Sequence, residues 1–206
     1  MAKRSFDVVL ALVLGAILAL PVLGMLVWLA LGQGRPFLYG AERMKAPGEG
    51  FTLWKFRTMI EAAGDSGVSG GDKAARITAQ GATMRRYRAD EIPQLWNVLR
   101  GDISFVGPRP PLRQYVEAFP TLYARVLRSK PGITGLASLT YAAHEERLLA
   151  RARTREETDA IYRRTCVPAK ARLDLIYQRH ASFCYDLALI WQTARRFTPA
   201  WFGKRD

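Results

Sequence analysis

The sequence has few of the residues that build metal centres and disulfide frameworks. Its 206 residues include only two cysteines and two histidines. Cys166 and Cys184 are not at a metal-ligand spacing, and His144 and His180 are isolated from them and from each other. This scarcity argues against a zinc site and a disulfide scaffold. The cysteines are typical of reduced thiols in a cytosolic body.

Acidic residues are also scarce. The chain has 18 Asp and Glu against 31 Lys and Arg, which gives a formal net charge of +13 and a pI near 10.3. The excess predicts an anionic partner, and nucleic acid, anionic lipid and nucleotide-sugar phosphates all qualify. Residues 61–73 are rich in glycine but lack the Gly-Lys-Ser/Thr sequence and the helix of a P-loop, so they predict a flexible loop.

One long apolar run lies near the N-terminus. No residue from Val8 to Leu31 is charged, and the run is long enough to cross about 30 Å of hydrocarbon. Its length, with no small-x-small site at its end, argues against a cleaved signal peptide. Lys3 and Arg4 precede the run and further basic residues follow it, which favours both ends on the cytoplasmic side. Pro21 near the middle would kink the helix, and these features leave a straight anchor and a re-entrant helix open.

A pair of adjacent carboxylates, Asp90 and Glu91, lies among arginines that include Arg85 and Arg88. A carboxylate can attack phosphorus or hold Mg²⁺, while guanidinium groups neutralise the other phosphate oxygens. The order of residues 90–93 predicts that Asp90 is the N-cap of a helix, where free amides favour an anion. A carboxylate pair before a helix is also a common cap without catalysis, so this pattern alone leaves both roles open.

Two other segments carry candidate phosphate ligands. Residues 51–59 alternate between apolar and polar positions, which predicts a strand from which Lys55 and Arg57 project the same way. A solvated strand face is the simpler interpretation of these two residues. Arg109 has a proline on each side, which stiffens its backbone and lowers the entropy lost when it binds phosphate.

The C-terminal stretch combines aromatic and basic side chains, which fits a helix in the lipid headgroup region. A core helix with a basic tail is the alternative. These residues are Trp191, Arg195, Arg196, Phe197, Trp201, Phe202, Lys204 and Arg205. The charged stretch 144–164 is predicted to be helical and solvated.

At this point a resemblance becomes specific. The run from Asp90 to Pro110 resembles the signature of the monotopic phosphoglycosyl transferases, a family of bacterial sugar transferases. Four further segments are similar to family motifs in the same order: Phe6-Asp7, Lys55–Met59, Arg76–Thr78 and Pro131–Gly135. The resemblance implies an α/β fold, mostly helical with a small sheet. It also implies a re-entrant helix-break-helix over residues 1–34 and, over 35–206, a cytosolic catalytic domain with interfacial amphipathic helices.

The resemblance implies a reaction as well. Such enzymes transfer a sugar 1-phosphate from a UDP-sugar to undecaprenyl phosphate and release UMP, with Mg²⁺ as cofactor. Asp90 matches the family nucleophile and Glu91 its second carboxylate, and both would lie at the metal. The residues expected to bind substrate are Lys55, Arg57, Arg85, Arg88, Pro108, Arg109, Pro110, Asp174 and Asp186. For Asp174 and Asp186, helix capping or pairing with nearby arginines is the alternative role.

The same resemblance implies a place in the cell. The site would face the cytoplasm at the bacterial inner membrane, among membrane lipids, and would serve the first membrane step of glycoconjugate assembly. No nucleic-acid partner is expected, and a homodimer is left open. The family bend has a Ser-Pro pair, whereas this chain has Leu20-Pro21, so the geometry of the bend stays open.

Two other classes of protein fit parts of the sequence. A membrane-tethered protein that binds nucleic acid or anionic lipid accounts for the charge and the apolar run, but not for Asp90 and Glu91 beside a Pro-Arg-Pro loop. A phosphatase, or another phosphoryl-transfer enzyme with an aspartyl intermediate, would use the same chemistry with water as the acceptor.

Overall fold

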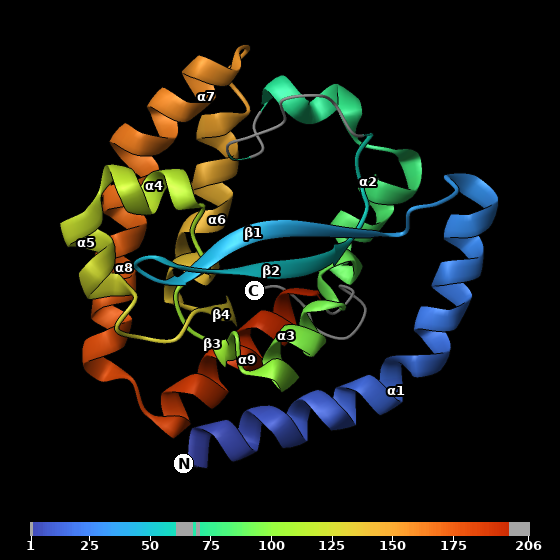
Figure 1. Ribbon diagram of the computed structural model, residues 1–206, viewed down its shortest axis with the longest axis horizontal. Coiled ribbons are helices and arrows are strands. Elements are labelled where there is room, and N and C mark those ends of the chain that lie inside the picture. Colours follow the sequence, from blue (N-terminus) through green and yellow to red (C-terminus); the bar gives the residue numbers. More distant parts are fainter. Residues whose placement is uncertain (1, 61–67, 69–70, 198–206) are drawn as a thin grey trace, which may run out of the picture.

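Helices dominate the protein. The computed structural model describes residues 2–60, 68 and 71–197. Within these residues the strands form one antiparallel pair and one parallel pair, and helices surround both (Figure 1). The predicted mostly helical fold with little sheet is therefore confirmed, although its strands form two separate sheets.

The first helix, α1 (Ala2–Gly32), is the one helix in the described residues that is long and apolar enough to cross a membrane. Figure 1 shows it bending between its two halves, so that it curves around one side of the body. Pro21 lies inside the helix, which continues through it, so the predicted helix-break-helix is one bent helix. Proline removes a backbone hydrogen bond, which allows a kink without ending the helix. Leu20 is 79% exposed.

Polar side chains attach the first turns of α1 to the body. The Asp7 carboxylate accepts a hydrogen bond from the backbone N–H of Phe105 at 3.2 Å. The Arg4 guanidinium donates to two carbonyl groups at the end of α3 (Gln94–Arg100), at 2.5 and 2.7 Å. Arg4, one of the basic residues before the apolar run, therefore binds the protein itself.

A β-hairpin follows, made of β1 (Leu38–Ala46) and β2 (Glu49–Phe56). Its turn contains Gly48 at φ +77°, a conformation that favours glycine. The strand predicted over 51–59 starts earlier and ends at Phe56, and Met59 makes only an isolated bridge.

The segment after the hairpin differs from the prediction at Asp90. Thr78 caps α2 (Ala79–Arg86) by accepting from the Gly81 N–H at 2.9 Å. Asp90 then lies inside a short 3-10 turn, η2 (Ala89–Glu91), and α3 begins only at Gln94. The prediction that Asp90 is a helix N-cap is wrong. Arg88, in the left-handed region at φ +55°, starts η2, and Pro93 precedes α3.

The parallel pair joins β3 (Ser104–Val106) and β4 (Gly132–Thr134). The backbones approach closely here: a Cβ on Gly107 would lie 2.1 Å from the Lys130 carbonyl oxygen. Only glycine fits at such a distance. The loop that leaves β3 at Gly107 is therefore held firmly at its start.

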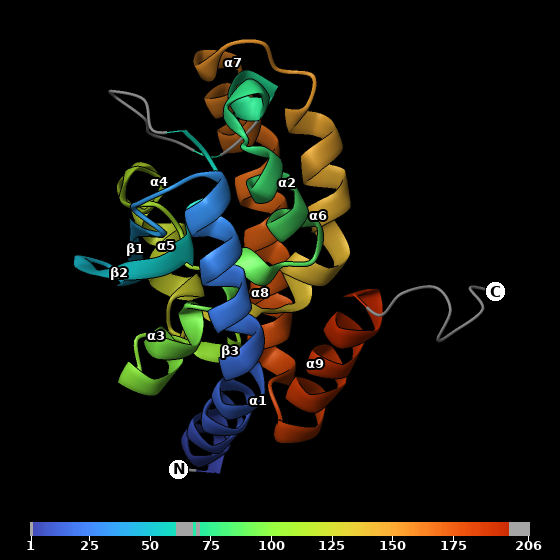
Figure 2. The same ribbon diagram turned by 90° about the vertical axis from the view of Figure 1, so that its right-hand side faces the viewer.

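The remaining helices cover one side of the body and extend away from it at the end of the chain (Figure 2). They are η1 (Gly71–Arg76), α4 (Arg113–Ala118), α5 (Pro120–Val126), α6 (Leu136–Leu149), α7 (Arg155–Ile161), the π-helical η3 (Tyr162–Cys166), α8 (Val167–His180) and α9 (Phe183–Phe197). The stretch 144–164 is largely helical, as predicted, and many of its side chains are exposed.

The buried apolar side chains form separate clusters that fix these elements. One unites α1, β2 and α3 through Ala11, Leu53 and Val98. Another joins the end of α1 to β2 and α2 through Leu29 and Phe56. The two halves of α1 thus pack on different clusters, which fits its bend.

Candidate active site

The Glu91 carboxylate lies at the centre of a cluster of basic side chains. Its Oε1 accepts from Lys55 Nζ at 2.8 Å and from Arg109 Nη2 at 2.5 Å. Arg88 Nη1 lies 3.8 Å from the same oxygen. Strand β2, turn η2 and the loop after β3 therefore bring their side chains to one point.

The charge of Glu91 depends on these partners. Burial alone would raise the pKa of Glu91, which is 8% exposed. The charges of Arg109 and Lys55 and their hydrogen bonds outweigh burial and hold this pKa well below its ordinary range. Glu91 is thus an anion that organises the cations, and a poor proton acceptor near neutral pH.

Asp90 is buried beside this cluster, but one of its two carboxylate oxygens lies outside the hydrogen bonds of the cluster. It is 7% exposed, and among the described residues its Oδ1 is buried without a hydrogen-bond partner. Burial raises the pKa of Asp90, opposed mainly by the charge of Lys55. A buried carboxylate oxygen without a partner is uncommon in proteins, which suggests an accepting position kept for a ligand or a reaction.

These carboxylates fit Mg²⁺, which proteins usually hold through one or two carboxylates together with substrate phosphates. Asp90 offers the unpartnered Oδ1, and Glu91 lies next to it in the chain. In the described part of the chain no three His, Cys, Asp or Glu side chains gather as a metal cage. The residues therefore fit a metal that substrate phosphates complete.

The environment of the cluster shifts the pKa values of Lys55 and Arg109 in opposite directions. Burial, together with the charge of Arg109, lowers the pKa of Lys55 to about 8. The charge of Glu91 raises the pKa of Arg109. Arg109 is thus charged at any physiological pH, whereas the charge of Lys55 is lost in mildly alkaline solution.

Two arginines border the carboxylates on the side of α2. Arg85 Nε donates to Thr58 Oγ1 at 3.0 Å, and the charges of Arg85 and Arg88 both act on Asp90. Arg88 adopts a backbone conformation that is uncommon outside glycine. Such conformations often occur at functional sites because the surrounding structure enforces them.

The loop that carries Arg109 is held by backbone contacts. The Pro108 carbonyl accepts from the Gly132 N–H at 2.8 Å, and Pro110 is buried. The prolines thus support the guanidinium through the backbone, which agrees with the stiffness expected of this tripeptide.

Arg57, predicted beside Lys55, lies elsewhere. Its Nη2 donates to the carbonyl oxygens of Gln33 and Gly34 at 3.1 and 3.0 Å. Arg57 comes after the last residue of β2, so it does not continue the alternation that predicted its direction. Its contacts attach the end of α1 to the hairpin.

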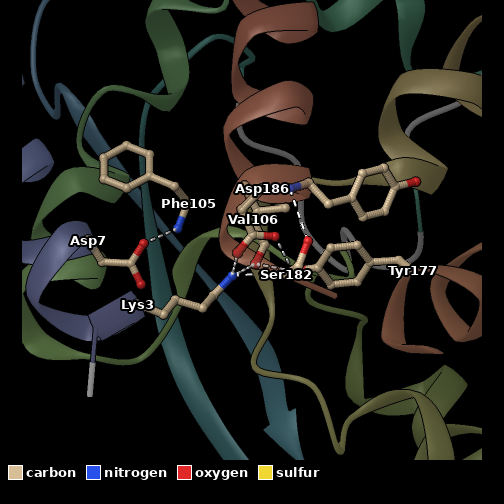
Figure 3. Close-up of polar contacts among 8 residues, drawn as sticks. Lys3, Asp7, Phe105, Val106, Tyr177, Ser182 and Asp186 are labelled. Carbon is tan, nitrogen blue, oxygen red and sulfur yellow. Dashed lines mark hydrogen bonds and ion pairs between the residues drawn. The ribbon is translucent and has the colours of Figure 1, made fainter. Parts of the chain in front are cut away.

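The structure also separates Asp186 from the cluster. Asp186 forms an ion pair with Lys3 and accepts from the Tyr177 hydroxyl at 2.6 Å (Figure 3). Lys3 donates to the Val106 carbonyl as well, at 3.1 Å. This set, which we call the α1 anchor (Lys3, Val106, Tyr177 and Asp186), joins the start of α1 to α8 and α9. From the sequence, Lys3 was assigned only a role in membrane topology.

Asp174 is buried on α8, away from the carboxylate pair. Burial raises its pKa to about 7, and Lys170 is the charge that opposes the shift. Lys170 itself donates to Glu145 at 3.1 Å and to Tyr162 at 3.2 Å. For both Asp174 and Asp186 the neighbouring cation is a lysine, so in the alternative role of charge pairing the partner is a lysine and not an arginine.

The sequence analysis did not identify one basic residue near the cluster as a site residue. Arg43 lies on β1, and its charge interacts with those of Arg109 and Glu91. A lone arginine in a segment not predicted as a strand gives no signal by itself. The register of the hairpin would have been needed to find it.

Taken together, the geometry defines an enzyme site for an anionic substrate. Cations converge on one carboxylate, and a second carboxylate beside it has an oxygen available for reaction or metal binding. The long apolar helix next to this site makes the chain a candidate membrane-associated enzyme.

Comparison with known proteins identifies the family. The model of the family described as bacterial sugar transferase matches residues 1–199, so the chain belongs to that family. It is 39% identical over 137 residues to an uncharacterized sugar transferase, EpsL, of Bacillus subtilis, covering 66% of this chain and 67% of that protein.

Two further relatives carry names that state a reaction. A putative undecaprenyl-phosphate N-acetylgalactosaminyl 1-phosphate transferase of Bacillus subtilis is 40% identical, over 57% of this chain and 66% of that protein. The UDP-glucose:undecaprenyl-phosphate glucose-1-phosphate transferase of Escherichia coli is 29% identical, over 93% of this chain and 39% of that protein. The match thus spans well under half of the longer relative. Membership of this family makes the chain a phosphotransferase.

Proposed function

We propose that this protein transfers a sugar 1-phosphate from a UDP-sugar to undecaprenyl phosphate and releases UMP. The observation that carries the proposal is the buried Asp90 carboxylate, whose Oδ1 has no hydrogen-bond partner among the described residues, beside cations organised by Glu91. The names of the relatives support the substrate classes.

The reaction proceeds in two displacements. An Asp90 oxygen attacks the phosphorus that carries the sugar, an aspartyl phosphosugar bond forms, and the bond to the leaving UMP oxygen breaks. An undecaprenyl phosphate oxygen then attacks the same phosphorus, and the bond to Asp90 breaks. Lys55 and Arg109 neutralise the phosphate oxygens, and Glu91 holds these two cations in place. When bound by Asp90 and Glu91, Mg²⁺ would reduce the repulsion between carboxylate and diphosphate.

The lipid acceptor requires a site at the membrane surface. We propose that α1 enters and leaves the cytoplasmic face of the inner membrane, because the protein body binds its start through Asp7 and its end through Arg57. Helix α9 adds an exposed apolar stripe at helical spacing, formed by Phe183, Leu187 and Trp191. The predicted Trp201, Phe202, Lys204 and Arg205 lie outside the described residues.

The test is UMP release from a panel of UDP-sugars, with and without undecaprenyl phosphate and Mg²⁺. We expect wild-type enzyme to release UMP and Asp90→Asn to lose at least about 1000-fold in rate, because an amide is a poor nucleophile. Asp102→Asn is the matched control, because Asp102 is also buried but contacts Asn97 and Arg100 instead.

Product analysis distinguishes the other classes. Without acceptor, the wild type should gain the mass of one sugar phosphate, and Asp90→Asn should not. Free sugar phosphate in place of lipid-linked diphosphosugar would indicate a hydrolase. Normal turnover by Asp90→Asn would contradict the covalent mechanism.

A further inference from the structure

The register of the hairpin places Arg43 on the same face as Lys55. Tyr39 pairs with Lys55, and Arg43 pairs with Phe51 four positions further along. Directly opposed residues of an antiparallel pair project to the same side, and the sides alternate along each strand. Tyr39, Ala41 and Arg43 therefore share one face with Lys55.

Arg43 is partly buried, and one nitrogen of its guanidinium lacks a partner within the part of the chain that the structure describes. Its Nε is inaccessible to solvent and has no hydrogen-bond partner among the described residues. The charges of Arg109 and, more weakly, Glu91 act on Arg43, and Glu91 already binds two other cations through one oxygen. Burying a guanidinium next to another cation costs free energy unless a further anion compensates it.

A bound diphosphate would provide such an anion at this site. We propose that Arg43 binds the diphosphate of a nucleoside diphosphate together with Lys55 and Arg109. This inference rests on the proposed function and names the part of the substrate that Arg43 recognises. A diphosphate supplies the negative charge that three cations around one carboxylate lack, and its oxygens match the donor fork of a guanidinium.

The neighbours of Arg43 indicate which phosphate it contacts. The charges of both Asp90 and Glu91 act on Lys55, whereas the largest charge effects on Arg43 come from Arg109, the tyrosines Tyr162 and Tyr39, and Glu91, and do not include Asp90. Asp90 attacks the phosphorus that bears the sugar. Arg43 therefore holds the phosphate that departs with the nucleoside, on the side away from the attacking oxygen.

The experiment measures the dissociation constant of UDP for the full-length protein in detergent, by calorimetry. We expect Arg43→Gln to raise it about 10- to 100-fold, the loss of one hydrogen-bonded charge contact. Arg43→Lys should give a smaller rise, because lysine keeps the charge but lacks the fork. The control is Arg113→Gln, since Arg113 is partly exposed and pairs with Glu42, on the opposite face of β1.

Thermal unfolding separates binding from a structural role. The proposal is overturned if Arg43→Gln, or Arg43→Lys where the first variant does not fold, binds UDP as tightly as wild type. It is also overturned if wild type does not bind UDP. If UDP binding depends on Arg43 but no UDP-sugar yields UMP, the inference stands and the proposed transfer reaction fails.

Discussion

Two groups of charged side chains in this protein are built from similar parts but differ in completeness. In the α1 anchor, the Asp186 carboxylate has Lys3 and Tyr177 as partners, and Lys3 also reaches a backbone carbonyl (Figure 3). In the active-site cluster, Asp90 Oδ1 and Arg43 Nε are buried without a hydrogen-bond partner among the described residues.

The presence or absence of hydrogen-bond partners for buried polar groups distinguishes a structural network from a binding site. A buried polar network in which each group has partners stabilises one arrangement of the chain. Groups left without partners cost stability, so where such groups lie together in one cluster of charged side chains, a ligand that completes them accounts for their presence. On this criterion the α1 anchor stabilises the fold, and the cluster around Glu91 is suited to binding a substrate.

After the loss expected for Asp90→Asn, the largest effect should come from a change of Glu91, at the centre of the active-site cluster. Glu91→Gln removes the charge that holds Lys55 and Arg109, and we expect UMP release to fall by about 100-fold as these cations lose their positions. Initial rates measure the effect. Glu117→Gln is the control, because Glu117 is exposed on α4. A loss below about threefold would mean that other contacts position the cations.

A smaller effect should follow from opening the complete network. Tyr177→Phe removes one hydrogen bond to the buried Asp186 carboxylate, and we expect the free energy of unfolding to fall by about 2 kcal/mol. For a chain of this size, thermal unfolding should show a drop of about 5 °C. Tyr185→Phe serves as control, because its ring lies beside that of Tyr177 and does not form this bond. Equal stability of the two variants would show that the α1 anchor tolerates an unfilled position.

The smallest effect is a change with pH at Lys55. Its pKa of about 8 means that the charge is present below this pH and is lost above it. We expect kcat/KM for the UDP-sugar to fall about tenfold from about pH 7 to about pH 9, and Lys55→Arg to abolish this decrease. A pH profile unchanged by Lys55→Arg would assign the decrease to another group.

The effect of pH on stability through Lys55 runs in the opposite direction to its effect on activity. The unfolded chain keeps this proton up to the ordinary pKa of 10.5, so it binds more protons than the folded chain above about pH 8. The contribution of Lys55 to the free energy of unfolding therefore rises with pH in that interval. Chemical unfolding of wild type and Lys55→Arg at several pH values measures it.

Local sequence was enough to find the core of the candidate site. Asp90, Glu91 and Arg109 lie within one short segment whose composition already indicates phosphate chemistry, and Lys55 is part of a recognisable strand pattern. The error at Asp90 is also local. The left-handed backbone of Arg88 begins a 3-10 turn before the helix, and no side-chain preference announces such a conformation in an arginine.

Contacts between distant segments set the limit of prediction. Arg43 required the pairing of β1 with β2, and β1 was not predicted as a strand. The pairing of Lys3 with Asp186 joins the two ends of the chain, so no local pattern reveals it. The predicted alternation does not extend to Arg57, because β2 ends one residue before it, at Phe56.

Helix α1 is attached to the rest of the protein near both of its ends. The helix has 31 residues, which would measure about 46 Å if straight. Both of its ends are tied to one rigid body, at Asp7 and through Arg57 to Gln33 and Gly34. A bilayer could straighten this helix only by breaking one of those ties. In the proposed membrane location, these attachments would therefore fix the distance between the candidate active site and the apolar bend of α1, whatever the thickness of the surrounding lipid.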